Sequence, residues 1–385
     1  MIIQPMIRNN ICLNAHPRGC VLYVQQQIDY ARKQGQLKFP KRVLIIGSSA
    51  GYGLASRIVS TFSAHADTLG IAFERPASGK RTASAGWYAN EAFLQKAKET
   101  GLYAHTIIDD AFAHSTKEQA VQAIKEHMGQ IDLLIYSLAS PIRIDPDTGE
   151  RYTSVLKPIG SSYSSLSADF SGNLRTVEVA PANDTEIRDT VKVMGGEDWE
   201  LWIRHLQKEQ VLAKGIHTVA YSYIGPELTY ALYRQGTIGK AKEDLEARAS
   251  TITALLSSLS GVAYVSVNKA LVTRASAVIP VVPLYLAILY KIMQEKNIHE
   301  ACIEQMYRLF ASRLNGDPNI DLQGRIRMDD WELRKDVQDE VNKRWKRISP
   351  ETAHELADFT RTQQEFLQIH GFSFDQIDYT KDETP

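Results

Sequence analysis

A glycine-rich turn between an apolar run and a helical pattern constrains this chain more than any other feature. Val43-Leu-Ile-Ile46 is followed by Gly47-Ser-Ser-Ala-Gly-Tyr-Gly53 and then by Leu54-Ala-Ser-Arg-Ile-Val59, which indicates a strand, a tight turn and a helix. The glycines of the turn let backbone and ligand approach closely because they carry no Cβ. Free N–H groups at the start of the helix favour an anion such as a pyrophosphate. The turn therefore predicts a dinucleotide-binding loop, with a purely structural glycine turn as the alternative.

The residues after the loop extend this prediction. The spacing G-x-x-x-G-x-G is similar to the dinucleotide loop of short-chain reductases, and Glu74 follows the next apolar run, 21 residues beyond Gly53. An acidic residue there typically holds the adenosine ribose hydroxyls, and its charge would repel a 2′-phosphate, which favours NADH. Two alternatives stay open: Glu74 is an ordinary solvated carboxylate, or the neighbouring Arg75 guanidinium receives a 2′-phosphate.

Strand and helix patterns alternate from residue 41 onward, which predicts a parallel sheet covered by helices. The predicted strands are 42–46, 69–73, 102–108, 131–137, 216–222 and 261–267. The predicted helices of this part are 51–65, 88–99, 116–128 and 239–258. We therefore expect an α/β fold, a Rossmann-type doubly wound parallel sheet, in which ligands bind beyond the carboxyl ends of the strands.

We expect a single domain, 1–385, in four parts. These are an N-terminal extension (1–40), a dinucleotide-binding core (41–140 and 201–300), a substrate-side insertion (141–200) and a helical C-terminal part (301–385).

Three local patterns give these parts their expected structure. A helix face in the extension comprises Cys20, Val21, Val24, Ile28 and Ala31. In the insertion, a β-hairpin pairs 142–144 with 151–155, and a second turn at 169–173 precedes the alternating stretch 174–179. An amphipathic surface helix in the C-terminal part carries Leu333, Val337, Val341 and Trp345.

Composition excludes several classes of function. The formal net charge is −1, so no basic field points to nucleic acid. Three widely spaced cysteines form neither a disulfide framework nor a metal-ligand spacing, which predicts no metal site and a cytoplasmic location. The uncharged segment 275–290 has 16 residues and two prolines, fewer than the roughly 20 residues that a membrane span needs. It predicts a buried helix or the wall of an apolar pocket.

Four tyrosines and two lysines follow the predicted strand 216–222; they are Tyr221, Tyr223, Tyr230, Tyr233, Lys240 and Lys242. A nicotinamide-dependent reductase needs an acid for an oxygen that becomes negative, and a phenol beside an ammonium group suits that task. The alternative is that these are half-buried core tyrosines and surface lysines. The pattern alone does not choose among the four tyrosines.

The pair Tyr233 and Lys242 is nine residues apart, so one continuous helix would place the two side chains on opposite faces. Gly236 and Gly239 interrupt the pattern, and we expect Thr237 to cap a new helix. With that break, both side chains can point at one site.

At this point the chain resembles a known family, the FabV-type trans-2-enoyl-thioester reductases. The glycine loop, the run Tyr221-Ser-Tyr-Ile-Gly-Pro-Glu227, the Tyr-x8-Lys pair and Lys269-Ala-Leu-Val-Thr273 carry the resemblance. Further similar stretches are Ala15-His-Pro-Arg-Gly-Cys20, Val193-Met-Gly-Gly-Glu-Asp-Trp-Glu-Leu-Trp202 and Gly371-Phe372. The resemblance spans the whole chain. It implies a monomer that uses NADH to reduce the α,β double bond of an enoyl thioester carried by acyl carrier protein or coenzyme A, the last reductive step of fatty acid elongation.

The resemblance also implies roles for individual residues. Tyr233 matches the proton donor, Tyr223 the tyrosine that contacts the substrate carbonyl, and Lys242 a lysine that binds the cofactor. The other implied cofactor contacts are Gly47, Ser48, Ser49, Ala50, Gly51, Tyr52, Phe73, Glu74, Asp110, Ala111, Leu138, Ala139, Leu271, Val272 and Thr273.

The chain departs from the family pattern at two positions. Tyr230 stands where tryptophan is expected and Arg274 where glutamine is expected. Arg274 follows a cofactor-contacting segment, so it could alter cofactor affinity or the preference for the acyl carrier. Two other functions are kept as alternatives: an NAD(P)H-dependent carbonyl reductase of the short-chain type, and a protein that senses NADH without turnover.

Overall fold

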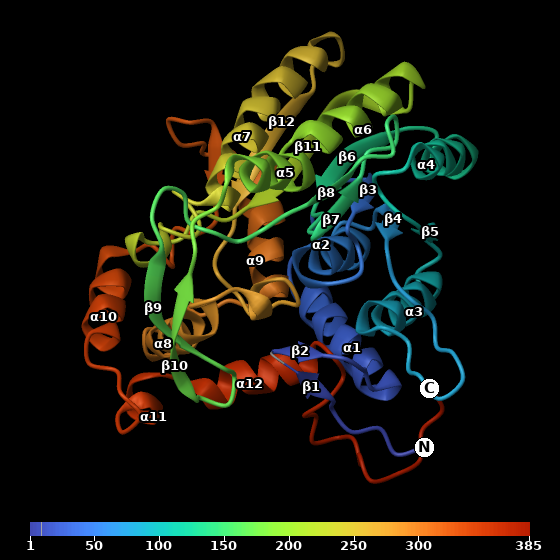
Figure 1. Ribbon diagram of the computed structural model, residues 1–385. Helices are drawn as coiled ribbons and strands as arrows, with labels where there is room; N and C mark the ends of the chain where they lie inside the picture. Colours follow the sequence, from blue (N-terminus) through green and yellow to red (C-terminus); the bar gives the residue numbers. More distant parts are fainter. Residues whose placement is uncertain (9) are drawn as a thin grey trace.

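A seven-stranded parallel sheet forms the centre of the computed structural model, which describes residues 1–8 and 10–385 (Figure 1). Its strand order is β13-β12-β11-β6-β3-β4-β5. The strands are β3 (Arg42–Ile46), β4 (Asp67–Ala72), β5 (Ala104–Ile108), β6 (Ile131–Tyr136), β11 (Leu212–Ser222), β12 (Val262–Val267) and β13 (Arg325–Arg327). The chain winds outward from β3 to β5, then returns to β6 and winds the other way. This confirms the predicted doubly wound α/β fold, with its switch point between β3 and β6.

Alternating side chains of each strand supply two separate cores. Val43 and Ile45 pack on one face of the sheet, whereas Leu44 and Ile46 pack on the other. Helices α1 (Pro17–Lys33), α2 (Gly51–Phe62), α3 (Ala85–Lys98), α8 (Val282–Glu295) and α9 (Cys302–Arg308) contribute to the first core. Helices α4 (His114–His127), α6 (Glu197–Lys208) and α7 (Thr237–Leu255) contribute to the second. Burial on both faces explains why the central strands β3 and β6 are nearly continuous apolar runs.

The predicted strands all occur, and β11 starts four residues before the predicted 216. Edge strand β13 was missed because its sequence, Arg-Ile-Arg, is not an apolar run. Arg325 lies inside the structure with its charge held by Asp321 and Glu246. Helices α5 (Asp184–Met194) and α6 were also missed, although Asn183 and Glu186 form a capping box at the start of α5.

The insertion forms two antiparallel hairpins. Strands β7 (Ile142–Ile144) and β8 (Arg151–Thr153) make the predicted one, which ends at 153 rather than 155. Strands β9 (Tyr163–Ala168) and β10 (Leu174–Val179) flank the predicted second turn, where the Asp169 carboxylate accepts the N–H groups of Ser171 and Asn173. Strand β9 lies beside α8 (Figure 1).

The apolar segment 275–290 folds as a short turn, Ser276–Val278, followed by the buried first part of α8. This confirms the prediction of a buried helix. In the part of the chain that the structure describes, no helix has both the length and the apolar character needed to cross a membrane. The predicted amphipathic helix is α10 (Lys335–Trp345), whose Val337 and Val341 are buried. Helices α11 (Ala353–Leu356) and α12 (Phe359–Gln368) follow it.

The last residues of the chain pack on α1, close to the first residues (Figure 1). The His16 N–H donates to the His370 carbonyl at 2.9 Å. A Cβ on Gly19 would lie 1.6 Å from the Gly371 carbonyl oxygen, so the two backbones touch. Of the predicted helix face, four residues are buried, but Val21 is 44% exposed, which makes its assignment to that face wrong. It lies one step around the helix from Cys20 and faces outward.

Candidate active site

The glycine loop joins β3 to α2 and is tied to the neighbouring strand. The N–H groups of Gly47 and Ser48 donate to the Ile71 carbonyl at 2.9 and 3.0 Å. Gly47 has φ +84°, a left-handed conformation that favours glycine. Helix α2 begins at Gly51, and the methyl side chain of Ala50 before it cannot cap the helix. The first N–H groups of α2 are therefore available to an anionic ligand.

Gly53→Ala is expected to raise the dissociation constant of NADH at least about tenfold and to lower the melting temperature. A Cβ at this position would lie 1.9 Å from the Gly47 carbonyl oxygen, so the loop must move. Inserting atoms into a tightly packed site costs about 1–3 kcal/mol. Fluorescence titration and thermal denaturation measure both effects, and exposed Gly35→Ala, whose Cβ meets only the Tyr307 hydroxyl at 3.4 Å, is the matched control. Unchanged NADH affinity in Gly53→Ala would contradict this account of the loop.

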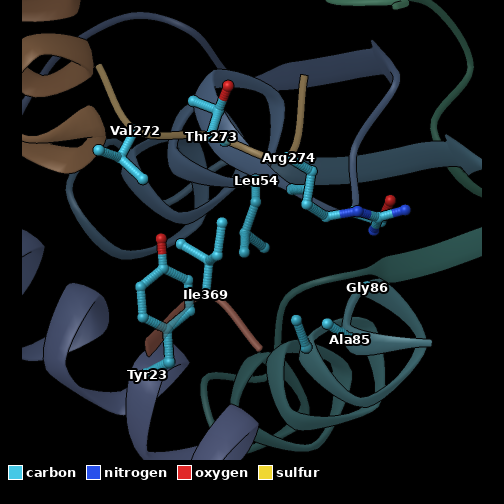
Figure 2. A pocket seen from close by; sticks show the side chains of 12 residues that line it. Tyr23, Leu54, Ala85, Gly86, Val272, Thr273, Arg274 and Ile369 are labelled. Atoms are coloured by element: carbon cyan, nitrogen blue, oxygen red, sulfur yellow. The ribbon is translucent and has the colours of Figure 1, made fainter. Parts of the chain in front are cut away.

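A pocket lies beside the loop (Figure 2). Its lining comes from the loop, from α1, α2 and α3, from the segment after β12 and from the end of α12; the residues are Tyr23, Ser49, Ala50, Gly51, Leu54, Ala85, Gly86, Ala89, Val272, Thr273, Arg274 and Ile369. Figure 2 shows Tyr23, Leu54 and Ile369 together, with Arg274 on the side of Gly86. The structure thus places parts of two predicted cofactor segments, 47–52 and 271–273, in the lining of one pocket.

Glu74 follows β4 and is held by two partners at the edge of this pocket. Its Oε1 accepts hydrogen bonds from the Ser49 hydroxyl and from Arg274 Nη1, both at 2.7 Å, and its side chain is 3% exposed. Gly86 leaves room for it, since a Cβ there would lie 2.1 Å from Oε1. Glu74 is therefore not a solvated carboxylate. Arg75 donates to carbonyls of its own loop, those of Pro76 and Thr82.

The remaining predicted cofactor residues also follow strand ends. Phe73, after β4, is 81% exposed, whereas Leu138 and Ala139, after β6, are half-buried and exposed. After β5, the Asp110 carboxylate accepts the Phe112 N–H at 3.0 Å. The Ala111 carbonyl accepts hydrogen bonds from Lys117 Nζ and Trp202 Nε1, both at 3.1 Å. Because Lys117 also forms a buried ion pair with Asp198, the backbone at Ala111 is firmly held.

Three of the four candidate tyrosines, Tyr221, Tyr223 and Tyr233, have different surroundings. The Tyr221 hydroxyl is hydrogen-bonded to the Ser56 hydroxyl of α2 at 2.6 Å, and that of Tyr223 is hydrogen-bonded to Glu332 Oε1 at 3.0 Å. Tyr233 is buried, and its ring packs edge-on against Tyr223 with centroids 4.8 Å apart. Its hydroxyl makes no hydrogen bond within residues 1–8 and 10–385. Burial raises the pKa of Tyr233, so the phenol keeps its proton at neutral pH.

Lys242 lies on the second turn of α7, which starts after the predicted break. The cap is Gly236 rather than Thr237, because the Thr237 hydroxyl donates to the Val155 carbonyl instead. The Lys242 ammonium donates to the Tyr221 carbonyl at 3.4 Å, and burial lowers its pKa to about 8. Lys240 points to Glu243 in solvent. Lys242 and Tyr233 therefore both lie against the carboxyl end of β11.

One buried carboxyl in this region was not anticipated from the sequence. Glu332 is fully buried and contacts Tyr223, Tyr285 of α8 and the backbone of Ala270. Its sequence context, Asp329-Asp-Trp-Glu332, is typical of a solvated acidic surface, so no signal pointed to it.

Family models match nearly all of the chain. A model described as the trans-2-enoyl-CoA reductase catalytic region matches residues 81–315, and one described as the NAD(P)H binding domain of trans-2-enoyl-CoA reductase matches residues 2–79. The chain belongs to the trans-2-enoyl-CoA reductase family. This confirms the resemblance drawn from the glycine loop and the tyrosine-rich run.

Individual family members match over their full length. An enoyl-[acyl-carrier-protein] reductase [NADH] of Flavobacterium johnsoniae is 53% identical, with 99% of this chain and 97% of that protein covered. One of Coxiella burnetii is 54% identical, with 99% and 95% covered. The trans-2-enoyl-CoA reductases of Clostridium acetobutulicum with NADH and of Treponema denticola with NAD match with TM-scores of 0.97 and 0.96 and identities of 46% and 50%, covering 100% of this chain and 98% of each.

A third model, described as an enoyl reductase FAD binding domain, matches residues 320–382. The residues of this segment do not fit a flavin diphosphate, which needs close backbone approach and cationic or N–H donors. Its buried charged groups include the acids Asp329 and Glu332. The space beside Gly371 is filled by the backbone at the start of α1, since a Cβ on Gly371 would lie 2.3 Å from the His16 carbonyl oxygen. The reaction of this protein is therefore derived without a flavin.

Proposed function

We propose that this protein uses NADH to reduce the trans-2 double bond of enoyl thioesters, with Tyr233 and Lys242 as its catalytic pair. The enoyl reductase activity and the use of NADH follow from family membership over the full length. The observation that supports the residue assignment is that Tyr223, Tyr233 and Lys242 lie together at the end of β11. One strand, β6, separates β11 from β3, the strand that the glycine loop follows.

The cofactor site that we infer follows the carboxyl edge of the sheet. Residues Gly47–Tyr52 would hold the pyrophosphate at the start of α2, and Phe73 and Glu74 the adenosine. Asp110, Ala111, Leu138, Ala139 and Leu271–Thr273 would line the rest. Lys242 would donate to the nicotinamide ribose. When bound, NADH supplies a hydride to the β-carbon of the enoyl thioester.

Tyr233 and Tyr223 would hydrogen-bond the thioester oxygen, on which negative charge develops during reduction. Tyr233 is buried and Tyr223 is partly buried, and donors act most strongly on a developing oxyanion where water is excluded. The raised pKa of Tyr233 means that it acts as a neutral donor. The α-carbon then receives a proton, directly from Tyr233 or through solvent.

We infer three further properties, which the family resemblance implies. Relatives are named for acyl carrier protein and for coenzyme A, so we propose that either carries the substrate. We also propose a monomer in the cytoplasm, where free cysteines such as Cys20 and Cys302 stay reduced.

The test follows NADH and NADPH oxidation in parallel, with crotonyl-CoA and with acetoacetyl-CoA. Rapid NADH oxidation with crotonyl-CoA alone is expected. Turnover of acetoacetyl-CoA instead would indicate a carbonyl reductase. Tight NADH binding without consumption of either substrate would indicate a sensor.

Arg274→Gln is expected to lower kcat/KM for NADPH relative to kcat/KM for NADH about tenfold, which corresponds to about 1.4 kcal/mol. The Arg274 guanidinium, 40% exposed, offsets the charge of Glu74 and could also approach a 2′-phosphate. Without it, Glu74 repels that phosphate more strongly. Steady-state kinetics with both cofactors measure the ratio. Arg75→Gln is the control, because Arg75 is bonded to its own loop; an unaltered ratio in Arg274→Gln would refute the role of this charge.

A further inference from the structure

The carboxyl of Glu332 is surrounded by hydrogen-bonding groups at the edge of the proposed active site. The hydroxyls of Tyr285 and Tyr223 lie 2.7 and 3.0 Å from its Oε1, and the Ala270 N–H donates to Oε2 at 2.6 Å. The side chain is fully buried. Tyr285 accepts from Gln338 Nε2 at 3.2 Å, so its own hydrogen is directed at Glu332.

The number of hydrogens decides what Tyr223 can do. A phenol has one hydrogen, so Tyr223 gives it either to Glu332 or to a substrate oxygen. If Glu332 is ionised, it holds that hydrogen. If Glu332 is protonated, the acid donates to the Tyr223 oxygen, and the hydrogen of Tyr223 is free for the substrate.

The surroundings of Glu332 shift its carboxyl toward the protonated form, relative to a carboxyl in water. Burial raises the pKa of its carboxyl, and the charge of Asp329 acts in the same direction. The hydrogen bonds from Tyr285 and Ala270 and the charge of Lys269 act against it. Desolvation is the largest of these effects, as expected for a carboxyl with no solvent contact.

We propose that Glu332 is a positioning residue of this reductase, whose carboxylic acid donates to the Tyr223 oxygen and so turns the Tyr223 hydrogen toward the thioester oxygen. The inference rests on the proposed function, in which Tyr223 contacts that oxygen. It gives the segment 320–382 a place in the enoyl reduction itself. Tyr223 and Glu332 are 109 residues apart in the chain and meet only in the folded protein.

The experiment uses the full-length protein with crotonyl-CoA and NADH and compares Glu332→Gln, Glu332→Leu, Tyr223→Phe and the double variant Tyr223→Phe/Glu332→Leu. Glu332→Gln keeps an N–H donor for Tyr223 and is expected to retain kcat within about threefold. Glu332→Leu is expected to lose roughly 10- to 100-fold, the range seen when a group that orients a functional side chain by a hydrogen bond is removed. The NADH dissociation constant is expected to stay unchanged in both. In the Tyr223→Phe background, Glu332→Leu is expected to add no further loss, because the two residues act through one hydrogen bond.

Three results would overturn the proposal: parent kcat in Glu332→Leu, an equal loss in Glu332→Gln and Glu332→Leu, or a full additional loss in the double variant. If Glu332→Leu does not fold, Glu332→Asp takes its place, because aspartate keeps the carboxyl but has a shorter side chain. Glu332→Asp is then expected to lower kcat in the parent background and not in the Tyr223→Phe background. Glu300→Gln makes the same chemical change at another buried carboxyl, which holds Arg308, and is expected to keep the parent kcat. A parent protein inactive with crotonyl-CoA would refute the proposed function instead.

Discussion

Tyr233→Phe is expected to lower kcat with crotonyl-CoA by roughly 100-fold or more, the usual cost of losing one oxyanion donor. The substitution removes a hydroxyl that forms no hydrogen bond within residues 1–8 and 10–385, and the ring remains packed on Tyr223. The fold is therefore expected to keep its stability while the proton donor is lost. Stopped-flow or steady-state measurement of NADH oxidation gives kcat, and thermal denaturation reports on stability.

Tyr221→Phe is the matched control for this prediction. Its hydroxyl is hydrogen-bonded to Ser56 of α2, so its loss is expected to cost about 0.5–1.5 kcal/mol of stability and little activity. A Tyr233→Phe enzyme with nearly the parent rate, or a larger kinetic loss in Tyr221→Phe, would show that the proton donor has been misassigned.

Lys242→Met is expected to raise the dissociation constant of NADH about 10- to 100-fold, because charge-assisted hydrogen bonds contribute about 1.5–3 kcal/mol. The methionine keeps the apolar stem but not the ammonium group. Lys240→Met is the control: it lies on the same helix, but its ammonium is bonded to Glu243 in solvent and should be dispensable. Titration calorimetry measures both affinities. Equal affinities in the two variants would exclude Lys242 from the cofactor site.

The lowered pKa of Lys242 adds a pH dependence with a defined sign. Burial brings the pKa to about 8, so the free protein carries the charge below pH 8 and loses it above. If NADH binds the charged form better, binding raises the pKa of Lys242. The affinity for NADH is then highest below pH 8, falls as the pH rises above 8, and levels off above the pKa of the complex. The same titration on Lys242→Met is expected to be flat across this range.

Local chemistry made much of the fold and of the loop predictable. Gly53 is required by a backbone contact within its own turn and Gly47 by its left-handed φ of +84°, and buried parallel strands are apolar on both faces. The break between Tyr233 and Lys242 was likewise predictable from Gly236, which caps α7, whereas the prediction that Gly239 also interrupts the helix was wrong, since Gly239 lies within α7.

The partners of these residues could not be predicted, because they come from distant parts of the chain. Glu74 was expected to face the cofactor, but the guanidinium that holds it lies 200 residues away. The sequence around Glu332 does not distinguish it from the acidic residues of an exposed surface. The order of the strands in the sheet decides which loops lie side by side, and therefore which distant residues meet. Local propensity and residue spacing do not reveal that order.

The contact between Gly19 and Gly371 has a consequence for biosynthesis. Helix α1 covers the first core, yet the backbone that closes against its first turn is made long after the helix itself. During translation one flank of α1 therefore stays uncovered until the segment around Gly371 has been synthesised. Deletion from Gly371 onward is thus expected to destabilise α1 as well.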